Sequence, residues 1–123
     1  MIFDVDKLDD ALRVMGRKQL KPEFRENWDP EHPRDGFCYV ISEVLYHYVV
    51  SDDFKPHVVR NENGSTHWYL QNNLGEILDL VVDPGDRDTD YYARGKPHRF
   101  RTANVSKRGA MLANLLRLVK QLR

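Results

Sequence analysis

The sequence lacks several features that define whole classes of protein. It has one cysteine, Cys38, so no disulfide can form within the chain, and no Cys-x-x-Cys pair is present to hold structural zinc. No apolar run approaches the roughly 18 residues of a transmembrane helix. Residues 1–6 contain neither a basic segment nor an apolar stretch, so we expect no signal peptide. These absences predict a cytoplasmic protein that makes no use of a membrane.

Acidic residues are missing from the C-terminal third of the chain. The whole sequence has 19 basic and 19 acidic residues, but residues 91–123 contain only basic ones: Arg94, Lys96, Arg99, Arg101, Lys107, Arg108, Arg117, Lys120 and Arg123. Such asymmetry can mark a nucleic-acid contact. The last predicted helix lacks the interleaved aromatic residues of single-strand binders, so we favour packing of this segment against the acidic part of the same domain. Nucleic acid stays an alternative partner.

The remaining composition is that of a globular protein. The sequence is 41% hydrophobic and 31% charged, and its 123 residues match the common size of one domain. We therefore predict a single domain over residues 1–123. The sequence does not determine its oligomeric state.

Hydrophobic periodicity predicts three helices. The first covers Val5–Met15 with Asp4 as its N-cap, and the second covers residues 37–50 with Asp35 or Gly36 as its cap. The third covers residues 106–122 with Ser106 as its cap. Its expected core stripe is Met111, Leu112, Leu115, Leu116 and Val119. The buried face of the second helix is expected to be Val40, Ile41, Val44, Leu45 and Tyr48.

Between the second and third helices, three runs rich in β-branched and aromatic residues predict strands at 56–61, 67–72 and 76–82. A further edge strand is predicted at 98–102. Residues 18–36 are predicted to form a long loop anchored by Phe24 and Trp28, and residues 83–96 a polar segment anchored by Tyr91 and Tyr92. The order predicts an α+β fold in which the second helix packs on a small antiparallel sheet.

The position of Cys38 suits thiol catalysis, which needs a thiolate, a base and a group that orients the base. Cys38 lies in the first turn of the helix predicted over residues 37–50. Backbone N–H groups and the helix dipole there stabilise a thiolate and can hold an oxyanion. A buried structural role is the alternative, because free cysteines are among the most buried residues.

His67 and Asp79 are polar residues within strand-like runs that are otherwise apolar or aromatic. An unpaired carboxylate is costly in such a setting, whereas a carboxylate bonded to an imidazole N–H is not. If residues 73–75 form a three-residue loop with Gly75 left-handed, Tyr69 lies opposite Asp79. His67 and Asp79 are then diagonal neighbours on one face, whereas a two-residue loop would place them on opposite faces.

These motifs carry a family resemblance. A helix opening on Gly-x-Cys (Gly36-Phe37-Cys38), then His-Trp (His67-Trp68), then Gly-x-x-x-Asp (residues 75–79) resembles the transglutaminase-like branch of the papain-like thiol enzymes. The resemblance covers residues 36–84. It implies that Cys38 is the nucleophile, that His67 is the base and that Asp79 orients His67. It also implies a papain-like core, in which the helix that bears the nucleophile packs on the sheet.

Five segments are also similar to short uncharacterised proteins encoded by bacteriophages: Cys38-Tyr39-Val40, Glu43, Leu45-Tyr46-His47, Thr66-His67-Trp68 and Ile77-Leu78-Asp79. Such relatives often continue with Thr-Ala-Asp-Gln after the strand, where this chain has Val81-Val82-Asp83-Pro84. This resemblance implies a phage protein acting in the host cytoplasm, and it supplies no substrate.

Other residues are weaker candidates for the site. Papain-like sites often use a Gln side chain upstream of the cysteine as an oxyanion donor, so the resemblance makes Gln19 and Asn27 candidates. Trp68 can wall the site or donate its indole N–H, although core packing explains it equally well. A metal site is disfavoured because His47 lies nine residues after Cys38 on one helix, a rise of about 13.5 Å. We expect neither a metal nor a cofactor.

The sequence thus predicts a cysteine hydrolase or transferase. It would transfer an acyl group from an amide, ester or thioester, with Cys38, His67 and Asp79 as its triad and a protein or peptide as its substrate. Hydrolysis, deamidation and transamidation are not distinguished. The alternative is a non-catalytic phage-type protein that binds or inhibits a host protein or nucleic acid.

Overall fold

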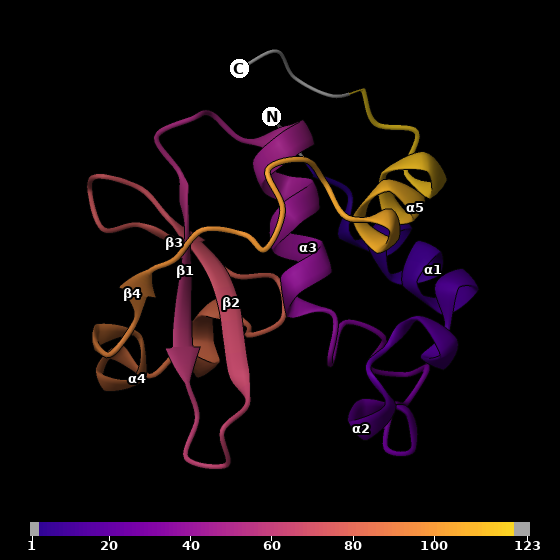
Figure 1. Cartoon of the computed structure of the whole chain (residues 1–123), viewed down its shortest axis with the longest axis horizontal. Helices are drawn as coiled ribbons and strands as arrows, with labels where there is room; N and C mark the ends of the chain where they lie inside the picture. Colours follow the sequence, from indigo (N-terminus) through magenta and orange to yellow (C-terminus); the bar gives the residue numbers. More distant parts are fainter. Residues whose placement is uncertain (1–2, 120–123) are drawn as a thin grey trace.

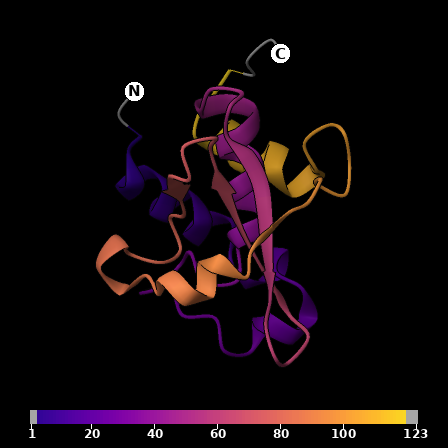
Figure 2. The ribbon, with the colours of Figure 1, turned by 90° about the vertical axis from the view of Figure 1, so that its left-hand side faces the viewer.

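The structure is a computed structural model, and it describes residues 3–119. It combines helices with a four-stranded antiparallel sheet, as the α+β prediction requires. Figure 1 shows the sheet between α4 (Thr89–Ala93) on one side and three helices on the other: α1 (Val5–Met15), α3 (Cys38–Val44) and α5 (Lys107–Leu115). Figure 2 views the same arrangement from the α4 side. No helix within the described residues is both long and apolar enough to span a membrane.

Helix α1 spans Val5–Met15, as predicted. Asp4 caps it, because its Oδ1 accepts the backbone N–H groups of Asp6 at 3.0 Å and Lys7 at 3.2 Å. The face that carries Leu8, Ala11, Leu12 and Met15 is buried. The helix ends at Gly16, which has a φ of 69°.

The segment predicted as a loop over residues 18–36 is partly helical. It contains a 3₁₀ turn at Arg17–Gln19 and the short helix α2 at Pro22–Arg25, where proline presets the backbone of the first turn. Trp28 is a buried anchor, as predicted, and its indole N–H donates to the carbonyl of Pro33 at 3.2 Å. The prediction for Phe24 is wrong, because that side chain is exposed.

Helix α3 spans Cys38–Val44 and continues as a π-helical segment at Leu45–Val49, so the extent predicted for this helix is nearly correct. The predicted cap is wrong: the N-cap position is Phe37, and no side chain caps it. Gly36 instead turns the chain into the helix with a φ of 84°. The predicted buried face is confirmed apart from Tyr48, which is half-buried: Val40, Ile41, Val44 and Leu45.

The sheet has the strand order β3-β2-β1-β4. Strands β1 (Lys55–Arg60) and β2 (Thr66–Gln71) match their predictions within one residue. Strand β3 is limited to Ile77–Leu78, shorter than the predicted 76–82, because the chain turns at Asp79. There the Asp79 carboxylate accepts the N–H groups of the residues two and three positions later.

The edge strand predicted at 98–102 is wrong. The edge strand is β4, Lys96–Pro97, which pairs with β1. The chain leaves the sheet after this strand because Phe100 packs into an aromatic cluster. Its ring stacks on Trp68 at a centroid distance of 5.6 Å and meets Tyr39 edge-on at 5.5 Å.

Helix α5 spans Lys107–Leu115, shorter than the predicted 106–122; residues 120–122 lie outside the described residues. Ser106 caps it as predicted, since its Oγ accepts the N–H of Gly109 at 3.1 Å. The predicted core stripe is wrong in part. Leu112 is buried and Leu116 packs at the edge of the core, but three members are exposed: Met111, Leu115 and Val119. Val119 leaves the stripe because the helix ends at Leu115 and Arg117 takes a φ of 57°.

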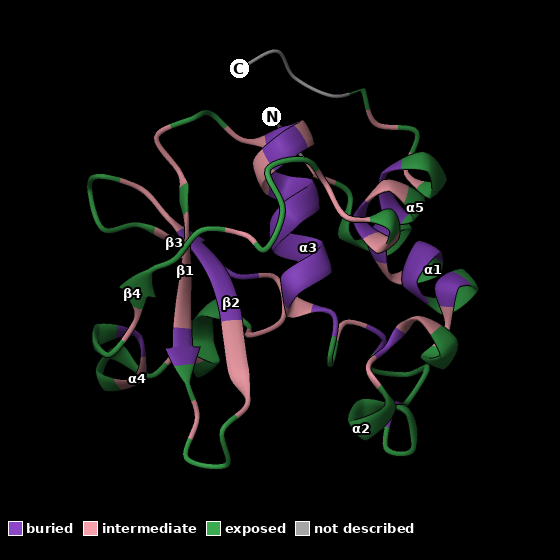
Figure 3. Ribbon diagram, viewed as in Figure 1, coloured by how far each residue is buried: buried purple, intermediate pink, exposed green. Residues whose placement is uncertain are grey.

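Two apolar clusters lie on the two sides of the sheet. The larger is formed mainly by α1, α3 and α5 and includes Leu70 of β2. The smaller consists of Val59, Tyr69 and Tyr92, so Tyr92 of α4 is an anchor, as predicted. Tyr91 packs beside it, half-buried. Figure 3 shows that buried residues concentrate in α3 and in the adjoining part of the sheet.

Candidate active site

Cys38 is the first residue of α3 and is half-buried. Its Sγ lies 4.0 Å from the carbonyl oxygen of Thr66, at the start of β2. The thiol is therefore held where the helix start meets the strand that carries His67. First-turn N–H groups of a helix have no acceptor within the helix, so they can stabilise a negative charge beside the thiol.

His67 and Asp79 are brought together by the hairpin of β2 and β3. Leu70 pairs with Leu78 and Gln71 with Ile77, a register that places Tyr69 opposite Asp79. Gly75 has a φ of 81°, so the predicted three-residue loop is confirmed. His67 Nε2 lies 2.5 Å from Asp79 Oδ2, a short charge-assisted hydrogen bond.

The Asp79 carboxylate is almost completely enclosed, with its side chain 1% exposed. Oδ2 accepts the Tyr92 hydroxyl at 2.6 Å as well as His67 Nε2. Oδ1 accepts the backbone N–H groups of Val81 at 2.9 Å and Val82 at 3.3 Å. Burial alone would raise the pKa of Asp79, but the hydrogen bonds and the charge of His67 outweigh it and lower this pKa. The Asp79 carboxylate is therefore ionised and hydrogen-bonded to His67.

Arg87 fixes the backbone that carries Asp79. Its guanidinium donates to the carbonyl of Asp79 at 2.9 Å and to that of Ile77 at 3.2 Å. These bonds hold the turn at the end of β3, where the chain has left the sheet. Sequence reasoning missed the roles of Arg87 and of the Tyr92 hydroxyl, because no spacing pattern links them to Asp79; a Tyr-Tyr pair after the strand was the only signal.

The surroundings of His67 favour its protonated form, the imidazolium. Burial lowers its pKa, but the hydrogen bond to Asp79 and the interactions with Cys38 and with the Asp79 charge outweigh burial and raise this pKa to about 9. Because Nε2 is bonded to Asp79, Nδ1 is the ring nitrogen left to exchange a proton with Cys38. His67 is therefore favoured as an imidazolium at neutral pH.

Cys38 opens into a cavity of about 350 Å³ that is also lined by Trp68. Trp68 is buried, and its indole nitrogen has no hydrogen-bond partner among residues 3–119. Gln19 and Asn27, the candidate oxyanion donors, are not among the residues that line this cavity. Trp68 is therefore the one auxiliary candidate that the structure places beside Cys38.

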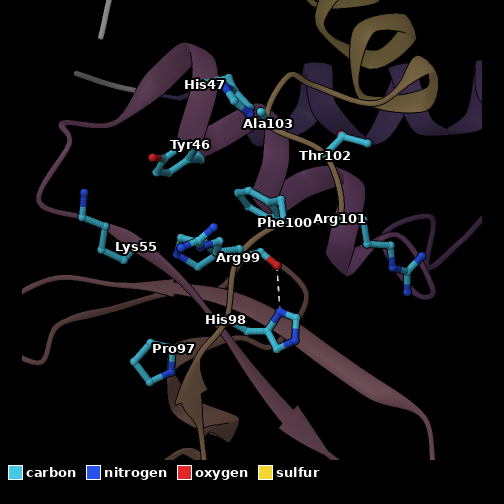
Figure 4. A pocket seen from close by; sticks show the side chains of 11 residues that line it. Tyr46, His47, Lys55, Pro97, His98, Arg99, Phe100, Arg101, Thr102 and Ala103 are labelled. Carbon is cyan, nitrogen blue, oxygen red and sulfur yellow. Dashed lines mark hydrogen bonds between the residues drawn. The ribbon is translucent and has the colours of Figure 1, made fainter.

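A larger cavity of about 700 Å³ lies between the segment that follows β4 and the side chains of Tyr46 and Lys55 (Figure 4). Its walls include Tyr46, Phe100 and Lys55, but none of Cys38, His67 and Asp79. Size alone would select this cavity as the site. Of the three residues, Cys38 lines the smaller cavity, whereas His67 and Asp79 line neither. Because the smaller cavity contains the residue with nucleophilic chemistry, we assign the candidate active site there.

Neither metal ligands nor relatives add to this description. Within residues 3–119, no group of three or more His, Cys, Asp or Glu side chains is placed to hold a metal ion. Comparisons with protein-family models, with curated proteins and with solved structures found no match to this chain.

Proposed function

We propose that this protein is a cysteine-dependent acyl-transfer enzyme with a papain-like core. Cys38 is the nucleophile, His67 the acid–base group and Asp79 the orienting group. The observation that carries the proposal is the enclosed hydrogen bond between Asp79 and His67, near the N-terminus of a helix whose first residue is the half-buried Cys38. A structural cysteine requires no such buried, charged pair beside it.

The reaction follows from these positions. The Cys38 thiolate attacks the carbonyl carbon of an amide, ester or thioester and forms a C–S bond. The oxyanion is stabilised by N–H groups at the start of α3, and His67 gives its proton to the leaving group as the bond to it breaks. Water or an amine, deprotonated by His67, then attacks the thioester and releases the thiol. Asp79 stays ionised and holds His67 in the tautomer with its proton on Nε2.

An activated ester tests this chemistry without knowledge of the substrate. We expect p-nitrophenyl acetate to give a burst of p-nitrophenol and an acetyl group on Cys38, detected by mass spectrometry of the intact protein. Cys38→Ala should abolish both signals. Asp79→Asn should reduce the burst rate at least about tenfold, because the imidazole loses its orienting charge.

A contrary result has a defined meaning. If wild type shows no burst and no acetyl group forms on Cys38, the acyl-transfer proposal fails. The binding or inhibitor protein suggested by the phage resemblance then becomes the working hypothesis, and its affinity for a partner should survive Cys38→Ala.

A further inference from the structure

We propose that the cavity beside Cys38 selects an acyl donor bearing a carboxylate, namely an acidic segment of a peptide or protein. This inference rests on the proposed function and names its substrate class. Four basic side chains from separate parts of the chain line this one cavity: Lys21, Arg60, Arg101 and Arg108. Such convergence around a nucleophile favours a negatively charged ligand.

These cations are not neutralised by ion pairs. Within residues 3–119, the only carboxylates within 4.0 Å of a basic side chain belong to pairs elsewhere: Asp10 with Arg13, Asp9 with Arg34, and Asp79 with His67. The opposing charges near the cavity are Glu23 on its rim and the buried Glu43, which is bonded to Ser106. The cavity keeps an excess of positive charge.

Two of the cations are fixed in position. Arg101 lies over the ring of Tyr39, the residue after Cys38, with its guanidinium carbon 4.9 Å from the ring centroid. Its backbone N–H also donates to the Tyr39 hydroxyl at 2.8 Å. Arg108 donates to the carbonyl of Gln19 at 2.7 Å. Arg101 lines the larger cavity as well, but in Figure 4 its side chain points away from Tyr46 and Lys55 on the other side of that cavity.

The cavity suits a peptide carboxylate better than a nucleic acid. Single-stranded nucleic acids bind through bases stacked on exposed aromatic rings along an extended basic groove. Here Tyr39 and Trp68 are buried, and Phe24 is the one exposed ring among the lining residues. A carboxylate beside an acyl group needs no such stacking surface.

Two alkylating reagents of nearly equal size isolate the effect of charge. Iodoacetate carries a carboxylate and iodoacetamide does not, and each forms a C–S bond on Cys38 with loss of iodide. We expect Arg60→Gln/Arg101→Gln to lower the iodoacetate-to-iodoacetamide rate ratio by about 3- to 5-fold at low ionic strength. Any effect of the lost charges on the thiol itself acts on both reagents and cancels in the ratio. Arg99→Gln/Lys107→Gln removes two charges from residues outside this cavity and should leave the ratio within about 1.5-fold of wild type.

Protection of Cys38 identifies the ligand class. A hexaglutamate peptide should slow alkylation by iodoacetamide in wild type, and less so in Arg60→Gln/Arg101→Gln, whereas a hexathymidylate should not. An unchanged reagent ratio in that variant overturns the inference, as does protection by the oligonucleotide but not by the peptide. Slow iodoacetamide alkylation of wild type would instead count against the proposed function, so the two failures are distinguishable.

Discussion

Removing the hydroxyl of Tyr92 tests whether the Asp79 carboxylate depends on the donors that surround it. In wild type the hydroxyl donates to Asp79 Oδ2 at 2.6 Å inside the protein. A hydrogen bond to a charged group contributes about 1.5–3 kcal/mol. Tyr92→Phe should therefore lower the free energy of unfolding at pH 7 by about 2 kcal/mol.

The loss should depend on pH, and its sign follows from the lowered pKa of Asp79. Stability gained by an ionised carboxylate is fully present above its unfolded pKa of about 4 and is lost as the pH falls through the folded pKa. The variant raises that folded pKa, so the difference between wild type and variant should shrink as the pH falls from 7 toward about 3.

Urea unfolding followed by circular dichroism at several pH values measures this difference, and the neighbouring tyrosine provides a matched control. The Tyr91 hydroxyl donates to the neutral Asn61 amide oxygen at 2.8 Å. Tyr91→Phe should cost about 1 kcal/mol with little dependence on pH. If Tyr92→Phe and Tyr91→Phe lose equal stability at every pH, the reasoning about Asp79 is refuted.

Three further predictions concern the elements around the site. The pKa of His67 rises from 6.5 to about 9 on folding. Its protonated form should therefore add about 3 kcal/mol to the free energy of unfolding below pH 6.5, and this contribution should be lost as the pH rises through 9. Urea unfolding of wild type from pH 6 to 10 should show the loss, and Asp79→Asn should remove most of the pH dependence. Gly75→Ala should cost about 1–2 kcal/mol in urea unfolding because φ is 81°, whereas Gly85→Ala, in open space without a positive φ, should cost well under that. Ser106→Ala removes both the α5 cap and a donor to the buried Glu43 carboxylate, so thermal unfolding should report a loss of about 2–3 kcal/mol; no loss would contradict the capping role.

Helix caps and the loop of the β2–β3 hairpin could be predicted from the sequence, because each depends on a few neighbouring residues. Asp4 and Ser106 cap the helices that they were predicted to cap. Gly75 fixed the loop length and therefore the register that places His67 beside Asp79. These features depend on a few neighbouring residues, so a single sequence contains enough information to predict them.

Features that depend on distant contacts could not be predicted this way. Phe100 draws residues 98–102 out of the sheet by packing on Trp68, a residue more than thirty positions earlier. Helix α5 ends at Leu115, although apolar residues continue at helical spacing beyond it. The spacing alone therefore does not show where the helix ends. Tyr92 lies in α4 and Arg87 in the segment just before it, and both contact Asp79. No sequence motif links these residues to the hairpin of β2 and β3.

The most direct test of the account is the pH dependence of Cys38 alkylation by iodoacetamide, in wild type and in His67→Ala. A thiolate paired with the His67 imidazolium should react rapidly from below pH 7, and His67→Ala should move the rise in rate toward the value for a free thiol, about 8.5. Circular dichroism of the variant would show that the fold is retained. If Cys38 is inert in the folded protein, or if its pH profile is the same with and without His67, the proposed catalytic triad is contradicted.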